Sequence, residues 1–342
     1  VCGPGRAILL IAVVLAAGVG AAFFLLRGDE TPGYSPLNLD DDPFAYEGDR
    51  QEEFEVRAAA GHSHVLYAKS PGGIVASAER TARWREQVEA AAGEAGVDAD
   101  LIEGMVLLES AGRPDAMASD DLEGAAGLTQ ILAETATSLL GMDVDLAASR
   151  RLTRRLGSAR SEAEADRLRA RRAAVDERFD PAAALAGTGR YLKLALEELG
   201  REDLAVVSYH MGIGNLTSVL DAYGEDDVPY AQLYFDASPD RQPRTYRILT
   251  GLGDDSKTYL WRVLAAREVM RLYRDDRDQL ERLAQLQAGA DSAALVLHPP
   301  GEDDDGEDRP LPGDLAPYGL RARAGMTLRP EAFAVLSYIG QG

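Results

Sequence analysis

The chain has 342 residues, and its 36 basic and 57 acidic side chains give a formal net charge of −21. This acidity argues against a nucleic-acid partner, because phosphate binding needs a net basic face. The low overall hydrophobicity excludes a polytopic membrane protein, and the single cysteine excludes a disulfide scaffold and a cysteine-rich zinc site.

Residues 7–26 form an uncharged apolar run, AILLIAVVLAAGVGAAFFLL. At helical rise this run spans roughly 30 Å, the thickness of the hydrocarbon core of a bilayer. A cleaved secretory signal has a shorter apolar core that ends at small residues, whereas Phe23 and Phe24 follow the small residues here. We therefore expect residues 1–28 to form an uncleaved transmembrane signal anchor, with the remainder of the chain on the extracytoplasmic side.

Two segments hold much of the negative charge. Residues 29–55 contain ten acidic residues and one arginine, and residues 301–310 contain six acidic residues and one arginine. Both are poor in apolar periodicity, which is typical of disordered linkers. The sequence predicts an acidic disordered spacer over 29–74. It also predicts an acidic linker over 286–342, where a helix at 329–338 would begin a further domain.

Between these segments the pattern predicts an all-α domain over 75–285, because no run of alternating polar and apolar residues indicates strands. Residues 149–178 are rich in Arg, Glu and Ala, and we interpret them as a solvated, charged helical hairpin inserted in the domain. Asp98 is a good N-cap for the second expected helix. The expected helices are 75–96, 99–111, a short one from about 128 to 140, 181–200, 202–211, 213–223 and 256–285.

Glu109 is the most informative residue, because it ends an otherwise apolar helix. The negative end of the helix dipole and the apolar neighbours both disfavour the ionised carboxylate, so both raise its pKa. A glutamate with a raised pKa suits a general acid at neutral pH. The alternative from position alone is a glutamate at a helix end that faces solvent.

The motifs after Glu109 strengthen the catalytic interpretation. Glu109-Ser110 is followed by Pro114 and Ala116, then by the segment Gly-Ala-Ala-Gly-Leu-Thr-Gln at 124–130, and later by Ser-Tyr-His-Met-Gly at 208–212. Over about 97–275 the sequence resembles the lytic transglycosylases of the lysozyme-like superfamily, whose motifs have this order. The resemblance implies a goose-type, lysozyme-like helical fold that acts on the glycan strands of peptidoglycan.

In that family a single glutamate protonates the oxygen that links N-acetylmuramic acid to N-acetylglucosamine. It then serves as base for the C6 hydroxyl, which attacks C1 and gives a 1,6-anhydro sugar. The resemblance assigns this role to Glu109 and implies neither a cofactor nor a metal. It also implies that the substrate contacts come from Ser119, Gly127, Gln130, Tyr209 and Tyr259.

Three departures from the family pattern put the substrate contacts in doubt: Thr129 stands where methionine is usual, His210-Met211 replaces Asn-Ala, and Gly112 replaces an aromatic residue. Two other functions stay open. A hydrolytic muramidase on the same fold would use a second carboxylate, such as Asp115, Asp120 or Asp121, to activate water. A non-catalytic glycan-binding scaffold of the cell wall is the other. The histidines, including His62 and His64, lack the spacing of a metal site.

Overall fold

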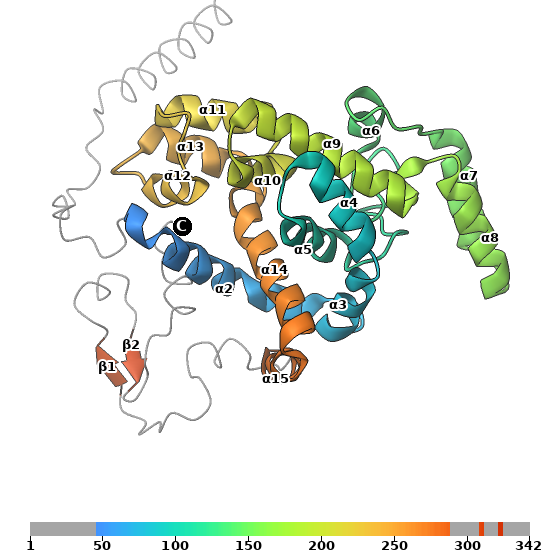
Figure 1. Cartoon of the computed structure of the whole chain (residues 1–342), viewed down its shortest axis with the longest axis horizontal. Coiled ribbons are helices and arrows are strands. Elements are labelled where there is room, and N and C mark those ends of the chain that lie inside the picture. Colours follow the sequence, from blue (N-terminus) through green and yellow to red (C-terminus); the bar gives the residue numbers. More distant parts are fainter. Residues whose placement is uncertain (1–45, 288–307, 311–320, 324–342) are drawn as a thin grey trace, which may run out of the picture. The chain divides into compact units, whose positions relative to one another are not determined.

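The computed structural model describes residues 46–287 and two short strands, β1 (Asp308–Pro310) and β2 (Arg321–Arg323), which pair antiparallel. All the regular secondary structure within 46–287 is helical, so the predicted all-α class is confirmed for this part of the chain (Figure 1). The predicted transmembrane helix and the helix expected at 329–338 lie outside the described residues. Among the described helices, none is both long and apolar enough to cross a membrane.

Most elements of the helical domain follow one another with short connections, and the long exception is the loop of residues 111–132 between α5 and α6. In chain order they are η2 (Gly48–Arg50), α2 (Gln51–Lys69), α3 (Ile74–Ala82), α4 (Arg85–Ala95), α5 (Ala99–Ser110), α6 (Ala133–Ser138), α7 (Leu146–Leu156), α8 (Glu162–Ala173), η3 (Glu177–Phe179), α9 (Pro181–Leu199), α10 (Glu202–Met211), α11 (Ile213–Tyr223), α12 (Tyr230–Asp236), α13 (Pro243–Gly251), η4 (Ser256–Thr258), α14 (Tyr259–Asp275) and α15 (Arg277–Gln287).

The prediction of a disordered spacer over 29–74 is wrong for its second half. Residues 51–69 form α2, which packs along α14 (Figure 1). Phe54 and Tyr67 of α2 are buried, and the Phe54 ring lies 4.9 Å from the ring of Phe235 in α12, centroid to centroid. The burial of these rings stabilises α2 enough to fold a segment that is rich in acidic residues, so the domain begins before residue 75.

The single helix expected over 75–96 is two helices, α3 and α4, that meet at Arg83–Trp84. The Trp84 indole N–H donates to the carbonyl oxygen of Gly112 at 3.0 Å, which ties this junction to the loop after α5. Likewise, the helix expected over 256–285 is divided into η4, α14 and α15. The expected helix near Leu128 starts only at Ala133, because residues 126–131 form a bridged turn.

Helix α5 runs through the centre of the domain and carries Glu109 near its C-terminal end. Its N-cap is as predicted, since the Asp98 carboxylate accepts the N–H of Asp100 at 2.9 Å. Gly104 brings α5 into close contact with α14: a Cβ there would lie 2.8 Å from the carbonyl oxygen of Val263. This close packing fixes the position of the last turn of α5 relative to α14.

Residues 146–173 form the expected charged hairpin from α7 and α8, which lies at one edge of the helical domain (Figure 1). Helices α12 and α13 were not expected from the sequence. Helix α12 supplies a buried aromatic cluster, in which the rings of Tyr230, Tyr234 and Phe235 lie within 6 Å of the Trp261 ring of α14.

Candidate functional site

Glu109 and Tyr259 meet directly, although 150 positions separate them in the chain. Glu109 lies in the last turn of α5, and Tyr259 begins α14. The Tyr259 hydroxyl donates to Oε1 of Glu109 at 2.6 Å. No other hydrogen bond to this carboxyl occurs among the described residues, so Oε2 is left without a partner there.

The surroundings of Glu109 raise the pKa of its carboxyl to near neutral pH. Although the residue keeps some exposure to solvent, burial by the surrounding protein raises the pKa of its carboxyl to about 7. The hydrogen bond from Tyr259 and the charge of Arg262 oppose this rise in pKa, and the charge of Asp255 adds to it. A carboxyl with this pKa is present in both protonation states near pH 7, as acid–base chemistry requires.

Tyr209 lies beside this pair. Its ring stacks on the ring of Tyr259 at 6.4 Å between centroids, and burial, followed by the charge of Glu109, raises its pKa. Its hydroxyl donates to the carbonyl oxygen of Thr129 at 2.8 Å. Tyr209 therefore joins the Glu109–Tyr259 pair to the loop of residues 117–131.

Gln130 lies in that loop, and its side-chain amide forms hydrogen bonds with neighbouring backbone carbonyl groups. Its Nε2 donates to the carbonyl oxygens of Gly127 at 2.8 Å and Ala116 at 3.2 Å. Gln130 also has a φ of +52°, in the left-handed region that few non-glycine residues adopt. Both amide hydrogens are thus used, and only the side-chain oxygen remains as an acceptor for a ligand.

Gly127, which the resemblance implies as a substrate contact, lets two parts of the chain approach each other closely. Its φ is +84°, and a Cβ at this position would lie 1.7 Å from the carbonyl oxygen of Arg178. No side chain fits there without moving the backbone, so Gly127 is required by the packing of the loop on η3.

Ser119 is not brought to Glu109 by any contact among the described residues. It is exposed, and its hydroxyl accepts the N–H of Asp121 at 3.2 Å in a local turn. The three loop carboxylates considered for water activation are exposed or partly so. Asp115 pairs with Arg169 at 3.7 Å, and Asp121 pairs with Arg150 at 3.4 Å, so both of these turn towards the α7–α8 hairpin.

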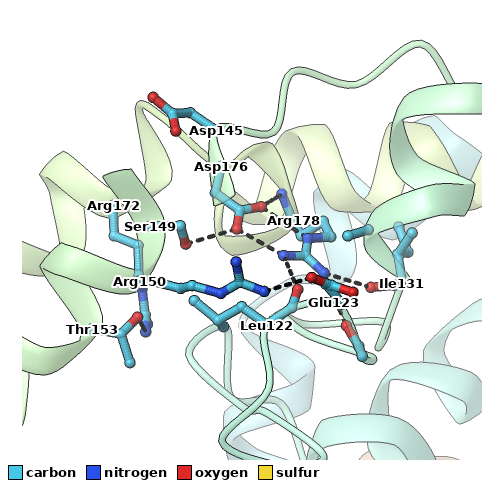
Figure 2. A network of polar contacts seen from close by, with 12 residues as sticks. Leu122, Glu123, Ile131, Asp145, Ser149, Arg150, Thr153, Arg172, Asp176 and Arg178 are labelled. Atoms are coloured by element: carbon cyan, nitrogen blue, oxygen red, sulfur yellow. Dashed lines mark hydrogen bonds and ion pairs between the residues drawn. The ribbon is translucent and has the colours of Figure 1, made fainter. Parts of the chain in front are cut away.

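Arg178, which the sequence analysis placed in a charged surface excursion, is completely buried and holds the loop in place (Figure 2). Its Nη1 donates to the carbonyl oxygen of Gly124 at 2.9 Å and its Nη2 to that of Leu122 at 2.9 Å. A weaker bond of 3.4 Å reaches the carbonyl oxygen of Ile131. One side chain therefore binds the loop at both ends of the Gly127–Gln130 turn.

The buried carboxylate of Asp176 compensates the charge of Arg178 (Figure 2). The guanidinium donates to Oδ1 through Nε and to Oδ2 through Nη2, each at 2.9 Å. Ser149 of α7 donates to Oδ2 of Asp176 at 2.8 Å. This network connects the hairpin to the loop next to Tyr209.

Charged and polar groups at the start of α14 surround Tyr259. Arg262 contacts the Tyr259 ring, with its guanidinium carbon 5.7 Å from the ring centroid, and it pairs with Asp255 at 2.5 Å. The His210 ring lies 5.1 Å from that of Tyr259, and its Nδ1 is 2.8 Å from the hydroxyl of Ser256. His62 of α2 lies close enough to Arg262 that its pKa falls to about 4, through burial first and then through this charge.

A cavity of about 380 Å³ lies elsewhere, between α2, α5, α10 and α14. Glu55, Asp203 and Arg267 are among the residues that line it, and no candidate site residue contributes. Within the part of the chain that the structure describes, no three His, Cys, Asp or Glu side chains cluster in a way that could hold a metal ion.

The structure thus brings Glu109, Tyr259 and Tyr209 together and joins them to the loop that holds Gln130 and Gly127, whereas Ser119 stays apart. The sequence analysis missed Arg178, Asp255 and Arg262. Comparison with models of known protein families and with curated proteins found no match for this chain.

Proposed function

We propose that the chain is a peptidoglycan lytic transglycosylase with a goose-type, lysozyme-like catalytic domain. It cleaves the β-1,4 bond between N-acetylmuramic acid and N-acetylglucosamine and leaves a 1,6-anhydro end. The observation that carries the proposal is the Glu109 carboxyl, whose pKa is raised to about 7 and whose Oε1 is held at 2.6 Å by the Tyr259 hydroxyl.

The chemistry proceeds through one carboxyl group. Protonated Glu109 gives its proton to the glycosidic oxygen as the bond from this oxygen to C1 breaks. The resulting carboxylate takes the proton of the C6 hydroxyl, and the C6 oxygen forms the new bond to C1. Because Tyr259 occupies Oε1, both proton transfers use Oε2. The carboxyl ends the cycle protonated again, and no water is consumed.

The substrate-binding role falls to Gln130 of the loop and to Tyr209 next to Glu109. Gln130 accepts a hydrogen bond from the sugar through its side-chain oxygen, since its two amide hydrogens bind carbonyl oxygens of its own loop. Tyr209 keeps part of its surface exposed and offers its ring to the sugar, whereas Tyr259 is 1% exposed and acts through its hydrogen bond to Glu109, not as the substrate contact that the resemblance implied. Ser119 and Gly127 carry no part of the proposal, since Ser119 lies apart from Glu109 and Gly127 packs against Arg178. The partner is a peptidoglycan glycan strand, and the proposal needs neither cofactor nor metal.

A hydrolytic muramidase is the second candidate, and Asp255 is the observation that favours it. Its charge raises the pKa of Glu109, as a neighbouring carboxylate does in enzymes that activate water. Because Asp255 also pairs with Arg262 at 2.5 Å and lies 3.6 Å from His210, its carboxylate is not free to activate water, and the transglycosylase remains the better supported candidate.

The location proposed for the enzyme follows from the N-terminal sequence. Residues 1–28 would anchor the chain in the membrane, and the domain would face the cell wall outside the cytoplasm.

The test is digestion of purified peptidoglycan by the full chain, with mass spectrometry of the products. We expect 1,6-anhydro ends, and we expect Glu109→Gln to lower the rate by about 10²–10⁴-fold, because it removes the proton donor with little change of shape. Glu198→Gln, an exposed change of the same kind on α9, should have no effect. Reducing ends would establish the muramidase instead, and unchanged activity of Glu109→Gln would refute both enzymes.

A further inference from the structure

The α7–α8 hairpin carries a net positive charge, opposite in sign to the net charge of the whole chain. Residues 146–173 contain nine arginines and three acidic residues, so the segment carries a net charge of +6 in a chain with a net charge of −21. The hairpin lies at one edge of the helical domain (Figure 1). Such a local excess of positive charge in an acidic protein calls for a physical explanation.

Three of the nine arginines have identified partners. Arg150 pairs with Glu123, Arg169 pairs with Glu162 and Asp166, and Arg172 is buried against the Phe179 ring. The other six are exposed, and their side chains make no hydrogen bond or ion pair with any described residue. They are Arg151, Arg154, Arg155, Arg160, Arg167 and Arg171.

The spacing of these arginines makes them repel one another. Arg151 and Arg155 lie one turn apart on α7, as do Arg167 and Arg171 on α8. Like charges at this spacing destabilise a helix, typically by a few tenths of a kcal/mol for each pair. An anion that binds between them removes this repulsion, and guanidinium groups bind phosphate oxygens through two parallel hydrogen bonds.

The surface also lacks the features of a membrane-binding helix. Interfacial helices place large apolar side chains next to their basic residues, whereas no exposed large apolar side chain lies in 146–173. The acidity of the rest of the chain opposes approach to an extended anionic surface or to a stiff duplex of high charge density. A flexible, linear anion can contact the hairpin alone.

We propose that the α7–α8 hairpin binds the polyol phosphate polymer of a bacterial cell wall. The assignment of this polymer as the source of phosphate rests on the proposed function, which places the domain at the wall. The hairpin would hold the enzyme at wall regions that carry the polymer, and the exposed arginines would contact successive phosphates.

The experiment measures binding of fluorescently labelled poly(glycerol phosphate) to the full chain by anisotropy over a range of salt concentrations. We expect saturable binding that weakens steeply as salt rises, because bound arginines release counterions. Neutralising Arg151, Arg155, Arg167 and Arg171 together to Gln should weaken binding by about tenfold or more, as expected for the loss of four exposed charge pairs.

A matched control neutralises four exposed cations elsewhere to Gln: Lys69, Lys193, Arg244 and Arg247. This control has the same net charge as the hairpin variant, so it should bind the polymer as the unmodified chain does. Neither variant should lower the thermal midpoint of unfolding, and both should retain the rate on polymer-free peptidoglycan. The rate on polymer-free peptidoglycan tests the proposed function, whereas polymer binding by a folded variant tests the hairpin, so a failure of one can be told from a failure of the other.

Three results would overturn the proposal. The first is equal binding by the hairpin variant and its control. The second is no binding by the full chain at low salt. The third is binding to a DNA duplex, to poly(glutamate) or to anionic phosphatidylglycerol vesicles that is as tight as binding to the polymer.

Discussion

Glu109 and Tyr259 form a pair in which one residue tunes the proton affinity of the other. Burial makes the carboxyl hold its proton more tightly, and the hydroxyl of Tyr259 stabilises the ionised form by donating a hydrogen bond to it. The balance of these opposed effects leaves the pKa of Glu109 at about 7. A change in the hydroxyl therefore alters the pH range in which Glu109 can act as an acid.

We expect Tyr259→Phe to move the alkaline limb of the pH profile of kcat/KM upwards by about one pH unit. Without the hydrogen bond the carboxylate loses stabilisation, so the pKa of Glu109 rises and the protonated acid persists to higher pH. The measurement is the rate of glycan cleavage from about pH 5 to pH 9.

The control for this substitution is Tyr223→Phe, because Tyr223 also donates to a carboxylate, that of Asp236 at 2.8 Å, away from Glu109. It should leave the profile where it is. An alkaline limb that stays in place in Tyr259→Phe would show that the hydroxyl does not tune Glu109.

At the residue scale, local pattern predicted Glu109 but not its partners. A carboxylate at the end of an apolar helix stands out in the sequence, and its raised pKa agrees with the expectation. Tyr259 was singled out only through the family resemblance, because a hydrogen bond across 150 positions leaves no local pattern. Arg178 could not be recognised, since Asp-x-Arg in an arginine-rich segment looks the same whether it is buried or exposed.

Among the elements, the loop of residues 117–131 depends most on a single side chain from elsewhere. Arg178 binds carbonyl oxygens of this loop, and its own charge is balanced by buried Asp176. Loss of the guanidinium would leave the carboxylate unpaired in the interior and the carbonyl groups without donors. Both consequences destabilise the folded state.

We therefore expect Arg178→Met to lower the free energy of unfolding by about 3–5 kcal/mol. Urea unfolding followed by circular dichroism measures this difference. Arg150→Met is the matched change, because Arg150 binds the same loop through exposed pairs with Asp121 and Glu123, and it should cost less than about 1 kcal/mol. Equal costs for the two variants would contradict the buried network as the support of the loop.

The helices that were predicted well are those with a clear apolar face. Helices α5, α9, α10 and α11 begin and end within a residue or so of the expected bounds. Helix α2 was missed because two of the five residues that it buries, Ala58 and Ala59, are small, and because acidic residues surround its start. Helix α12 is short, and its aromatic residues are stabilised by Trp261 from α14, which no local pattern indicates.

On the scale of the whole molecule, α2 decides where the folded domain begins. Its Phe54 is 4% exposed and packs between Tyr46 and Phe235. If α2 belongs to the core, its loss must destabilise the domain as a whole and not only its first residues.

We expect Phe54→Ala to lower the free energy of unfolding by about 3–5 kcal/mol, because it removes a buried ring and leaves a cavity. Val56→Ala serves as control, since Val56 is 57% exposed on the same helix and should change stability by less than about 0.5 kcal/mol. Thermal or urea unfolding of the full chain gives both values. If the Phe54→Ala variant were as stable as Val56→Ala, α2 would not be part of the folded core, and residues 51–69 would belong to the spacer as first predicted.

The pairing of α2 with α14 also sets an order of events during synthesis. Helix α2 leaves the ribosome early, whereas α14 comes near the end of the described domain. The side chains of α2 that pack on α14 therefore lack this partner until almost the whole domain has been made. A nascent chain of this design needs protection from aggregation between the synthesis of α2 and that of α14, and the domain closes only when this last long helix has been made.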